Sequence, residues 1–243
     1  QVETVTAVAT PSQLVFLTTP QSPTAGSCSG KLTVQTQDSF GNPQAPAGGA
    51  SVSLSAAPAA GFQFYAGTDP TCAGAPVAAV SIPAGGNSAD FHFRSTAAGS
   101  PAVTASSPPL NPATQVETVV PAAASRLVFT SGAQSRQAGA CSAAATVESQ
   151  DAYGNVSAVA APTAVSLSAS PAAGFGFYSD AGCTAAAAGT TVAAGSSAAS
   201  FWFKGTAPGN VTVTASVTGW GPSPTQVETI TPAAADHLVF TSG

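Results

Sequence analysis

The chain repeats itself at a spacing of 110 to 114 residues, and this repeat restricts the possible folds more than any other feature. A unit of this length is too long for one turn of a helical solenoid and has the size of a small domain. We therefore expect tandem copies of one domain. Two short motifs mark the copies: Gln-Val-Glu-Thr at 1–4, 115–118 and 226–229, and Leu-Val-Phe at 14–16, 127–129 and 238–240.

Within each copy, apolar residues alternate with polar ones, which is typical of strands that bury one face. The runs at 32–35, 52–55, 91–93 and 211–214 show this alternation. Gly, Pro, Asn and Asp separate such runs every 8 to 15 residues, as turns do between strands. We expect an all-β fold with seven or eight strands per unit, arranged as an antiparallel β-sandwich.

The phase of the repeat indicates where the domains begin and end. A Pro/Ala-rich segment at 121–124 follows one Gln-Val-Glu-Thr motif and precedes the next Leu-Val-Phe motif, which is typical of a linker. Such short linkers with Pro favour a restrained, elongated chain of domains. The predicted organisation is a last strand of a preceding repeat at 1–10, domain 1 at 11–120, domain 2 at 121–231, and a first strand of a following repeat at 232–243.

The four cysteines form two repeated pairs, Cys28 with Cys72 and Cys141 with Cys183. A metal site needs about four suitable ligands, whereas each repeat offers two cysteines and no shared His. We therefore predict one disulfide per domain, Cys28–Cys72 and Cys141–Cys183. Closing a loop of this size stabilises a domain by about 4 kcal/mol in the chain-entropy model. Disulfides place the chain in an oxidising compartment outside the cytosol.

Charged residues are scarce, with 5 basic and 10 acidic side chains among 243 residues and a formal net charge of −5. So few basic residues argue against nucleic acid and anionic membranes as partners. Every apolar run is interrupted before the ~18 residues that direct membrane insertion would need. A surface made mostly of Ser, Thr and Ala lacks the charge repulsion that keeps proteins apart. We therefore predict side-by-side packing with copies of the same chain or with adjacent repeats.

A turn that occurs in both repeats resembles a known family. Asp-Ser-Phe-Gly-Asn at 38–42 and Asp-Ala-Tyr-Gly-Asn at 151–155 each follow an alternating strand. This turn, with the downstream segments 88–91 and 99–104, is similar to the bacterial immunoglobulin-like repeats of invasin and intimin. The resemblance covers both domains. It implies tandem immunoglobulin-like sandwiches of about a hundred residues each, on the bacterial cell surface.

Several repeated acidic and amide residues are candidate calcium ligands. Calcium requires six or more oxygen ligands, usually with several carboxylates among them. The other interpretation is that Asp and Asn cap their own tight turn while Gly supplies a positive φ. The candidates are Asp38, Asn42 and Asp69 in domain 1, and Asp151, Asn155 and Asp180 in domain 2.

A glutamate recurs in the predicted last strand of each repeat, at Glu3, Glu117 and Glu228. An intradomain isopeptide bond would need a Lys at a shared position, and the two repeats share none. We interpret the glutamate as a charge on an edge strand, which blocks unwanted strand pairing.

Two aromatic positions are candidate contact residues. In the runs 91–93 and 201–203, alternation points the two Phe inward and His92 or Trp202 outward. An exposed Trp202 or Trp220 can stack on a sugar or contact a neighbouring molecule. The sequons at 155–157 and 210–212 are possible glycosylation sites.

No nucleophile–base pair or phosphate-binding loop is shared by the two repeats, so we expect neither catalysis nor a cofactor. The first hypothesis is a structural segment of an extracellular bacterial surface stalk, fibre or filament, with possible strand complementation between neighbours. The alternative is an adhesin module that binds a cell-surface or carbohydrate ligand through residues that differ between repeats.

Overall fold

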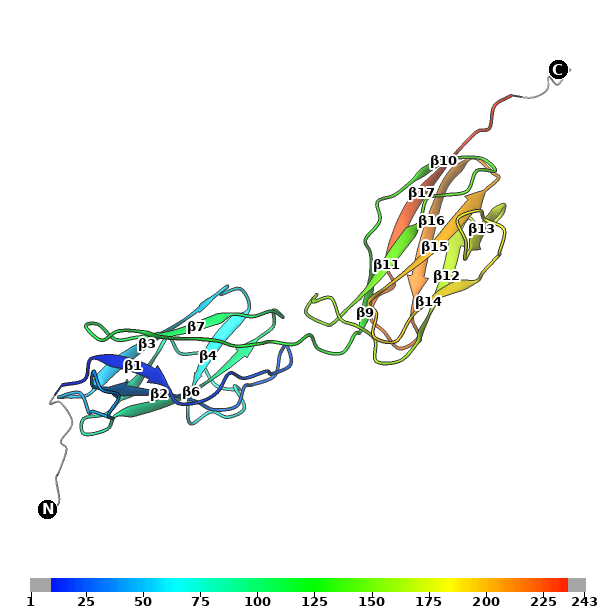
Figure 1. The fold of residues 1–243 in the computed structure, drawn as a ribbon. Coiled ribbons are helices and arrows are strands. Elements are labelled where there is room, and N and C mark those ends of the chain that lie inside the picture. Colours follow the sequence, from blue (N-terminus) through cyan, green and yellow to red (C-terminus); the bar gives the residue numbers. More distant parts are fainter. Residues whose placement is uncertain (1–9, 236–243) are drawn as a thin grey trace, which may run out of the picture. The chain divides into compact units, whose positions relative to one another are not determined.

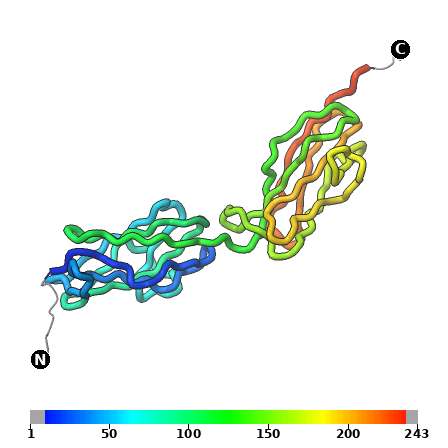
Figure 2. Tube along the Cα trace, viewed as in Figure 1, coloured from blue at the N-terminus to red at the C-terminus, as the bar shows by residue number. Residues whose placement is uncertain are grey.

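The protein folds into strands, turns and loops throughout the part that the structure describes, residues 10–235 of a computed structural model (Figure 1). The chain divides into two compact units, here called unit 1 (Gln1–Ala122) and unit 2 (Ala123–Gly243), and passes between them once (Figure 2). No helix able to cross a membrane occurs among the described residues. The strands predicted at 1–10 and 232–243 lie mainly outside this part of the chain and stay predictions.

Unit 1 is a sandwich of two four-stranded antiparallel sheets. One sheet has the order β1-β2-β6-β4 and the other the order β5-β3-β7-β8. More and less buried residues alternate along β2, β3 and β7, because successive side chains point to opposite faces of a sheet. The strands are β1 (Gln13–Phe16), β2 (Leu32–Gln37), β3 (Ala50–Ala57), β4 (Phe62–Ala66), β5 (Ala79–Ile82), β6 (Ser88–Ser95), β7 (Ala102–Ser106) and β8 (Ala113–Val116).

Unit 2 repeats this architecture, with sheets in the orders β13-β15-β11-β9 and β10-β17-β16-β12-β14. It has nine strands rather than the predicted seven or eight. The additional strand is β10, which runs parallel to β17; in unit 1 the equivalent contact is an isolated bridge between Thr24 and Val120. The strands are β9 (Arg126–Phe129), β10 (Ser135–Gln137), β11 (Ala145–Gln150), β12 (Thr163–Ser170), β13 (Phe175–Tyr178), β14 (Gly189–Val192), β15 (Ala198–Gly205), β16 (Gly209–Ser216) and β17 (Thr225–Thr231).

Each unit has its own core, organised around four phenylalanines on two neighbouring strands. In unit 1, Phe93 of β6 stacks on Phe62 of β4 with ring centroids 4.8 Å apart. Phe91 meets Phe64 edge to face at 5.9 Å. Such pairs contribute about 0.5–1.5 kcal/mol beyond the area they bury. The equivalent pairs of unit 2 are Phe175–Phe203 at 5.2 Å and Phe177–Phe201 at 5.8 Å.

Candidate functional site

Each unit contains one disulfide. It joins the segment before β2 to the loop after β4 in unit 1, and the segment before β11 to the loop after β13 in unit 2. Cys28 is bonded to Cys72, 44 residues away, with Cα atoms 5.5 Å apart. Cys141 is bonded to Cys183, 42 residues away, with Cα atoms 5.7 Å apart. The second cysteine of each pair is buried. The structure therefore forms the predicted pairs, and no cysteine is free among the described residues.

The disulfide-linked loop changes the environment of the residue between the two inward phenylalanines. His92 shares the outer face of its strand with Arg94, as the alternation predicts, but it is only 4% exposed. Its Nδ1 donates a hydrogen bond to the carbonyl oxygen of Ser29, 3.1 Å away. His92 therefore lies on the outward face as predicted, but segments distant in the sequence cover this face and bury it. Trp202, its counterpart in unit 2, is half-buried, and its contact role stays a prediction.

The repeated Asp–Asn turn is held by its own carboxylate. Asp38 is buried, and its Oδ1 accepts the backbone N–H groups of Phe40 and Asn42, both at 2.9 Å. Its Oδ2 accepts the side-chain amide of Asn42 at 3.0 Å. Gly41 has a φ of 86°, which a glycine adopts without strain. Asp151 and Asn155 make the same contacts in unit 2, at 2.9, 2.9 and 2.7 Å.

The other two calcium candidates, Asp69 and Asp180, close the loops that carry the buried cysteines. Asp69 Oδ2 accepts the backbone N–H of Gly74 at 2.8 Å, and this bond does most to hold the pKa of Asp69 below its ordinary value. In unit 2 the N–H of Ala185 donates to Asp180 Oδ1 at 2.6 Å and similarly lowers the pKa of Asp180. Within residues 10–235, no three His, Cys, Asp or Glu side chains form a group that could hold a metal ion.

These loops position cysteines that have an unusual backbone conformation. Cys72 and Cys183 have φ angles of 50° and 49°, in the left-handed region that residues other than glycine seldom occupy. Each cysteine donates its N–H to the backbone carbonyl of the aspartate three residues earlier, at 3.3 and 3.1 Å. The aspartate thus stabilises, from both its carboxylate and its carbonyl, the tight turn that brings the cysteine over the strand.

The repeated glutamates are buried, so the prediction of an exposed edge charge is wrong for Glu117 and Glu228; Glu3 lies outside the described residues. Glu117 is 0% exposed and Glu228 is 1% exposed. Glu117 Oε2 accepts the backbone N–H of Gln21 at 2.5 Å, and Glu228 Oε2 accepts that of Gln134 at 2.5 Å. Burial raises the pKa of Glu228, although the Gln134 N–H and the Arg136 charge oppose this shift.

The two buried glutamates belong to a contact between the beginning and the end of each unit, which we call the terminal clasp. In unit 1 it comprises residues 21–25 and 117–120, and in unit 2 residues 134–138 and 228–231. Figure 1 shows its strand part in unit 2, where β10 lies beside β17. The aligned pairs there are Ser135 with Thr229, Arg136 with Ile230, and Gln137 with Thr231. Sequence reasoning missed this contact, because it joins segments about 95 residues apart.

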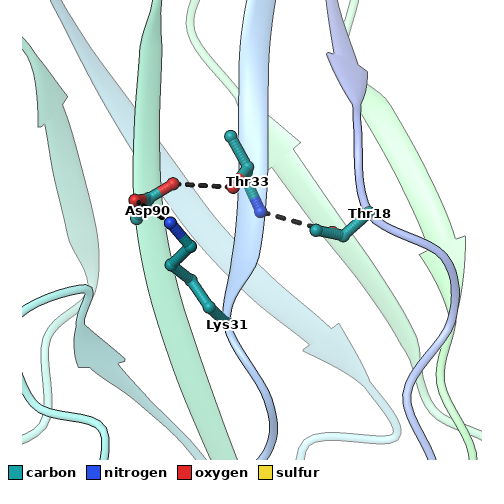
Figure 3. A network of polar contacts seen from close by, with 4 residues as sticks. All are labelled: Thr18, Lys31, Thr33 and Asp90. Atoms are coloured by element: carbon teal, nitrogen blue, oxygen red, sulfur yellow. Dashed lines mark hydrogen bonds and ion pairs between the residues drawn. The ribbon is translucent and has the colours of Figure 1, made fainter.

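A polar network on the outer face of β2 and β6 distinguishes the two units (Figure 3). Asp90 accepts a hydrogen bond from the Thr33 hydroxyl at 2.7 Å and forms an exposed ion pair with Lys31 at 2.9 Å. Partial burial would raise the pKa of Asp90, but these two partners outweigh it and hold the pKa below its usual value. In unit 2, Ala144 and Ser200 occupy the positions of Lys31 and Asp90. A contact between the Thr146 and Ser200 hydroxyl oxygens, 3.2 Å apart, replaces the Thr33–Asp90 bond.

Trp220 and Leu110 occupy equivalent loops between the last two strands of their units. Trp220 is half-buried, packs against the core of unit 2, and lines a small cavity of about 180 Å³ with Ala124 and Val159. Leu110 packs against the core of unit 1 beside a larger groove of about 520 Å³. The indole of Trp220 is thus partly used for packing. The prolines that line the groove of unit 1 are Pro11, Pro46, Pro108 and Pro109.

The aromatic residue of the Asp–Asn turn is exposed in both units, which the sequence did not reveal. Phe40 is 79% exposed and Tyr153 is 50% exposed. The position of this residue in the sequence could have indicated its exposure, because the tip of a tight turn seldom reaches a core.

Comparison with known proteins gives similarity in structure only. No family model and no curated protein matches the chain. The adhesin FdeC of Escherichia coli is 17% identical with a TM-score of 0.42, over 93% of this chain and 66% of that chain. Domains 4 and 5 of the S-layer protein SbsC are 15% identical with a TM-score of 0.36, over 91% of this chain and 99% of that chain. A β-glycosidase from Bacteroides vulgatus is 12% identical with a TM-score of 0.36, over 89% of this chain and 24% of that chain.

Proposed function

We propose that the protein is a non-catalytic structural segment of an extracellular surface chain, and that it belongs to a stalk, fibre or filament. The observation that carries this proposal is that the same disulfide-linked sandwich occurs twice, with its buried acidic groups bonded to its own backbone. Asp38, Asp151, Glu117 and Glu228 each accept a backbone N–H group. Groups that hydrolytic or acid–base chemistry would use are thereby committed to holding the fold.

The disulfides support a location outside the cytosol. Thiol-reducing systems keep cytosolic cysteines reduced, whereas secreted and surface proteins retain disulfides. In this protein the bond forms at the same place in both units, and a repeated aspartate shapes the loop that presents the cysteine. This shared arrangement fits a cross-link that is part of the repeat itself.

Neighbouring uncharged strands in one sheet of each unit support lateral association with other copies. In unit 1 no Lys, Arg, Asp or Glu occurs in the strands of the sheet β5-β3-β7-β8. Its outer face carries exposed hydroxyls at Ser51, Ser53 and Ser55. In unit 2, the equivalent strands β14, β12 and β16 are also uncharged, whereas β10 and β17 of the same sheet carry Arg136 and Glu228. Such faces do not repel one another, and this favours ordered packing.

An in-frame deletion of residues 115–225 tests the structural role, because it removes one repeat and recreates the Gln-Val-Glu-Thr junction. We expect intact source cells to display the shortened chain, and their surface structure to be shorter in electron micrographs. A chain lengthened by duplicating the same residues should give the opposite change. Chains found inside the cell with free thiols, or surface structures of unaltered length, would contradict the proposal.

The alternative role is a ligand-binding module, and it is favoured by the exposure of Phe40 and Tyr153 at the same turn in both units. Trp202 and Trp220 differ between repeats and are its other candidate contacts. A glycan array and a cell-binding assay test this role. Binding that the double variant Phe40→Ala/Tyr153→Ala abolishes would support it, and signals at background would exclude it for the glycans and cells used.

A further inference from the structure

The covalent connections of each unit determine where tension enters and leaves it. The chain enters a unit at its first strand, which is β1 in unit 1 and β9 in unit 2. It leaves from the last segment, which is β8 with residues 117–120 in unit 1 and β17 in unit 2. Any pull along a tandem chain therefore acts on these two segments before it acts on the interior strands. In both units the first strand pairs antiparallel with β2 or β11. The terminal clasp joins the segment that follows this strand to the end of the unit, so it bears the pull once the first strand has detached.

The clasp is a parallel pairing, and its direction determines how it bears the pull. In unit 2 the residues 134–138 are pulled from their N-terminal side, and β17 is pulled from its C-terminal side. Two parallel segments pulled in this way slide along one another, so that all the hydrogen bonds between them are strained together. In an antiparallel hairpin pulled from its open end, the bonds break one after another. A sheared pairing therefore resists tension more strongly than a peeled one with the same bonds.

The clasp has several hydrogen bonds in each unit that a sliding motion must break together. In unit 1, the N–H of Thr118 donates to Gln21 O at 3.0 Å, and the N–H of Ala25 donates to Val120 O at 2.8 Å. Between them, the N–H of Val120 donates to Pro23 O at 3.0 Å. In unit 2 the corresponding bonds are Thr229 N–H to Gln134 O at 2.9 Å and Ala138 N–H to Thr231 O at 2.8 Å.

The buried glutamate adds a side-chain hydrogen bond at the first residue of the clasp. Glu117 and Glu228 accept the N–H groups of Gln21 and Gln134, and both carboxylates are almost completely buried. Water competes poorly for a hydrogen bond at a buried site, so the bond is stronger there than it would be on the surface. The same side chain makes the same bond in both repeats, so the clasp has the same alignment in each.

The disulfide lies just beyond the clasp along the chain. Cys28 follows Ala25, and Cys141 follows Ala138, by three residues each. Once the clasp separates, the chain is released only as far as this cysteine. The bond then passes the tension directly to Cys72 or Cys183, and the strands between the two cysteines stay outside the loaded path.

We propose that the terminal clasp is the element that resists tension in each unit, and that the disulfide behind it limits the length released. The proposal deepens the structural role and rests on it for its biological meaning. Its test is made on the isolated chain, so a negative result leaves the surface location and the structural role standing. Conversely, a cytosolic location would contradict the proposed function but would not change the mechanical response of the isolated chain.

The experiment pulls single molecules of the full 243-residue chain from its two ends at constant force. We expect the double variant Glu117→Ala/Glu228→Ala to unfold about tenfold faster than the parent chain, because each unit loses a buried side-chain hydrogen bond and leaves a backbone N–H without its acceptor. The variant Glu117→Gln/Glu228→Gln keeps an acceptor oxygen and should stay within about threefold of the parent rate. A chemical denaturation curve verifies that each variant is folded before it is pulled.

A matched control separates resistance to tension from general stability. Val52→Ala and Val165→Ala remove buried side chains from β3 and β12, strands that do not belong to the clasp. These variants should lose stability in denaturant and unfold under force at nearly the parent rate. Equal acceleration by the clasp and core variants, or an unchanged rate in the clasp variants, would overturn the proposal.

The disulfide part of the proposal has its own measurement. Each unfolding step of the oxidised chain should be shorter than that of the reduced chain by about 150 Å, because 44 and 42 residues are held back at ~3.5 Å each. Steps of the same length with and without reductant would contradict it.

Discussion

At the scale of single residues, buried acidic side chains hold the backbone of this protein in position. Glu228 accepts one backbone N–H and is 1% exposed, so burial disfavours its charged form and raises its pKa. Asp38 and Asp151 instead receive two backbone N–H groups and a side-chain amide each. Several hydrogen-bond donors compensate for the free energy lost when an acidic group is buried. An acidic group with few donors is less well compensated and lowers the stability of the fold.

The variant Glu228→Gln tests the cost of burying this charge. Because the pKa of Glu228 is raised in the folded state, the folded protein binds the proton more tightly than the unfolded chain. The contribution of this group to stability therefore increases as the pH falls through its folded pKa, and its cost is complete at neutral pH. We expect Glu228→Gln to raise the free energy of unfolding at pH 7 and to remove this pH dependence. Denaturant unfolding of unit 2 between pH 4 and pH 7 measures both effects.

The half-buried Glu148 provides a control for the loss of one negative charge. Glu148→Gln should not reproduce the gain seen with Glu228→Gln. A loss of stability at pH 7 in Glu228→Gln would mean that the charged hydrogen bond outweighs the burial of the charge.

The variant Asp180→Ala tests the loop that carries Cys183. The pKa of Asp180 is lowered by hydrogen bonds from Ala185 and Thr184, so its contribution is complete at neutral pH and is lost as the pH falls through its folded pKa. We expect the variant to lose hydrogen-exchange protection at the Ala185 amide at pH 7. Acidification should abolish the difference between the parent and the variant. Full protection in Asp180→Ala would show that the disulfide alone holds the loop.

At the scale of strands, the fold depends on pairs of aromatic residues that face each other across neighbouring strands. Phe203 of β15 is fully buried and stacks on Phe175 of β13, as Phe93 of β6 stacks on Phe62 of β4. Alternation along the sequence predicted that Phe91, Phe93, Phe201 and Phe203 point inward, and the structure confirms this. It could not predict which aromatic residue meets which, because that depends on the register between strands.

Phe203→Ala should reduce the free energy of unfolding of unit 2 by about 3–5 kcal/mol, because it leaves a cavity in the core. Tyr153→Ala removes a ring that is 50% exposed and should change stability by less than about 0.5 kcal/mol. Denaturant titration of the two variants measures the difference. Similar losses in both would contradict the assignment of Phe203 to the core and of Tyr153 to the surface.

At the scale of the whole molecule, two units with separate cores share one chain. Each has its own sheets, disulfide and terminal clasp, and none of these features requires a residue of the other unit. Stability is therefore a property of each unit, and a local change should be confined to the unit that contains it.

Removing one disulfide tests this independence. Cys141→Ser/Cys183→Ser should reduce the free energy of unfolding of unit 2 by about 4 kcal/mol in the chain-entropy model. Unit 1 keeps Cys28–Cys72, so its transition should stay where it was. Calorimetry of the full chain should then resolve two transitions, of which only one has moved. A single transition that moves as a whole would show that the units unfold together.

The sequence by itself determined the repeat, the all-β fold, one disulfide per unit and the tight Asp–Asn turn. These features depend on spacing, on alternation and on the chemistry of neighbouring residues, which a linear sequence carries directly. Only the tertiary structure decided that His92, Glu117 and Glu228 are buried and that Phe40 is exposed. Alternation assigns a residue to one of two faces of a strand, but loops and segments far away in the sequence cover one face and leave another in water. The clasp is such a case, since its glutamate meets a backbone N–H about 95 residues earlier in the chain.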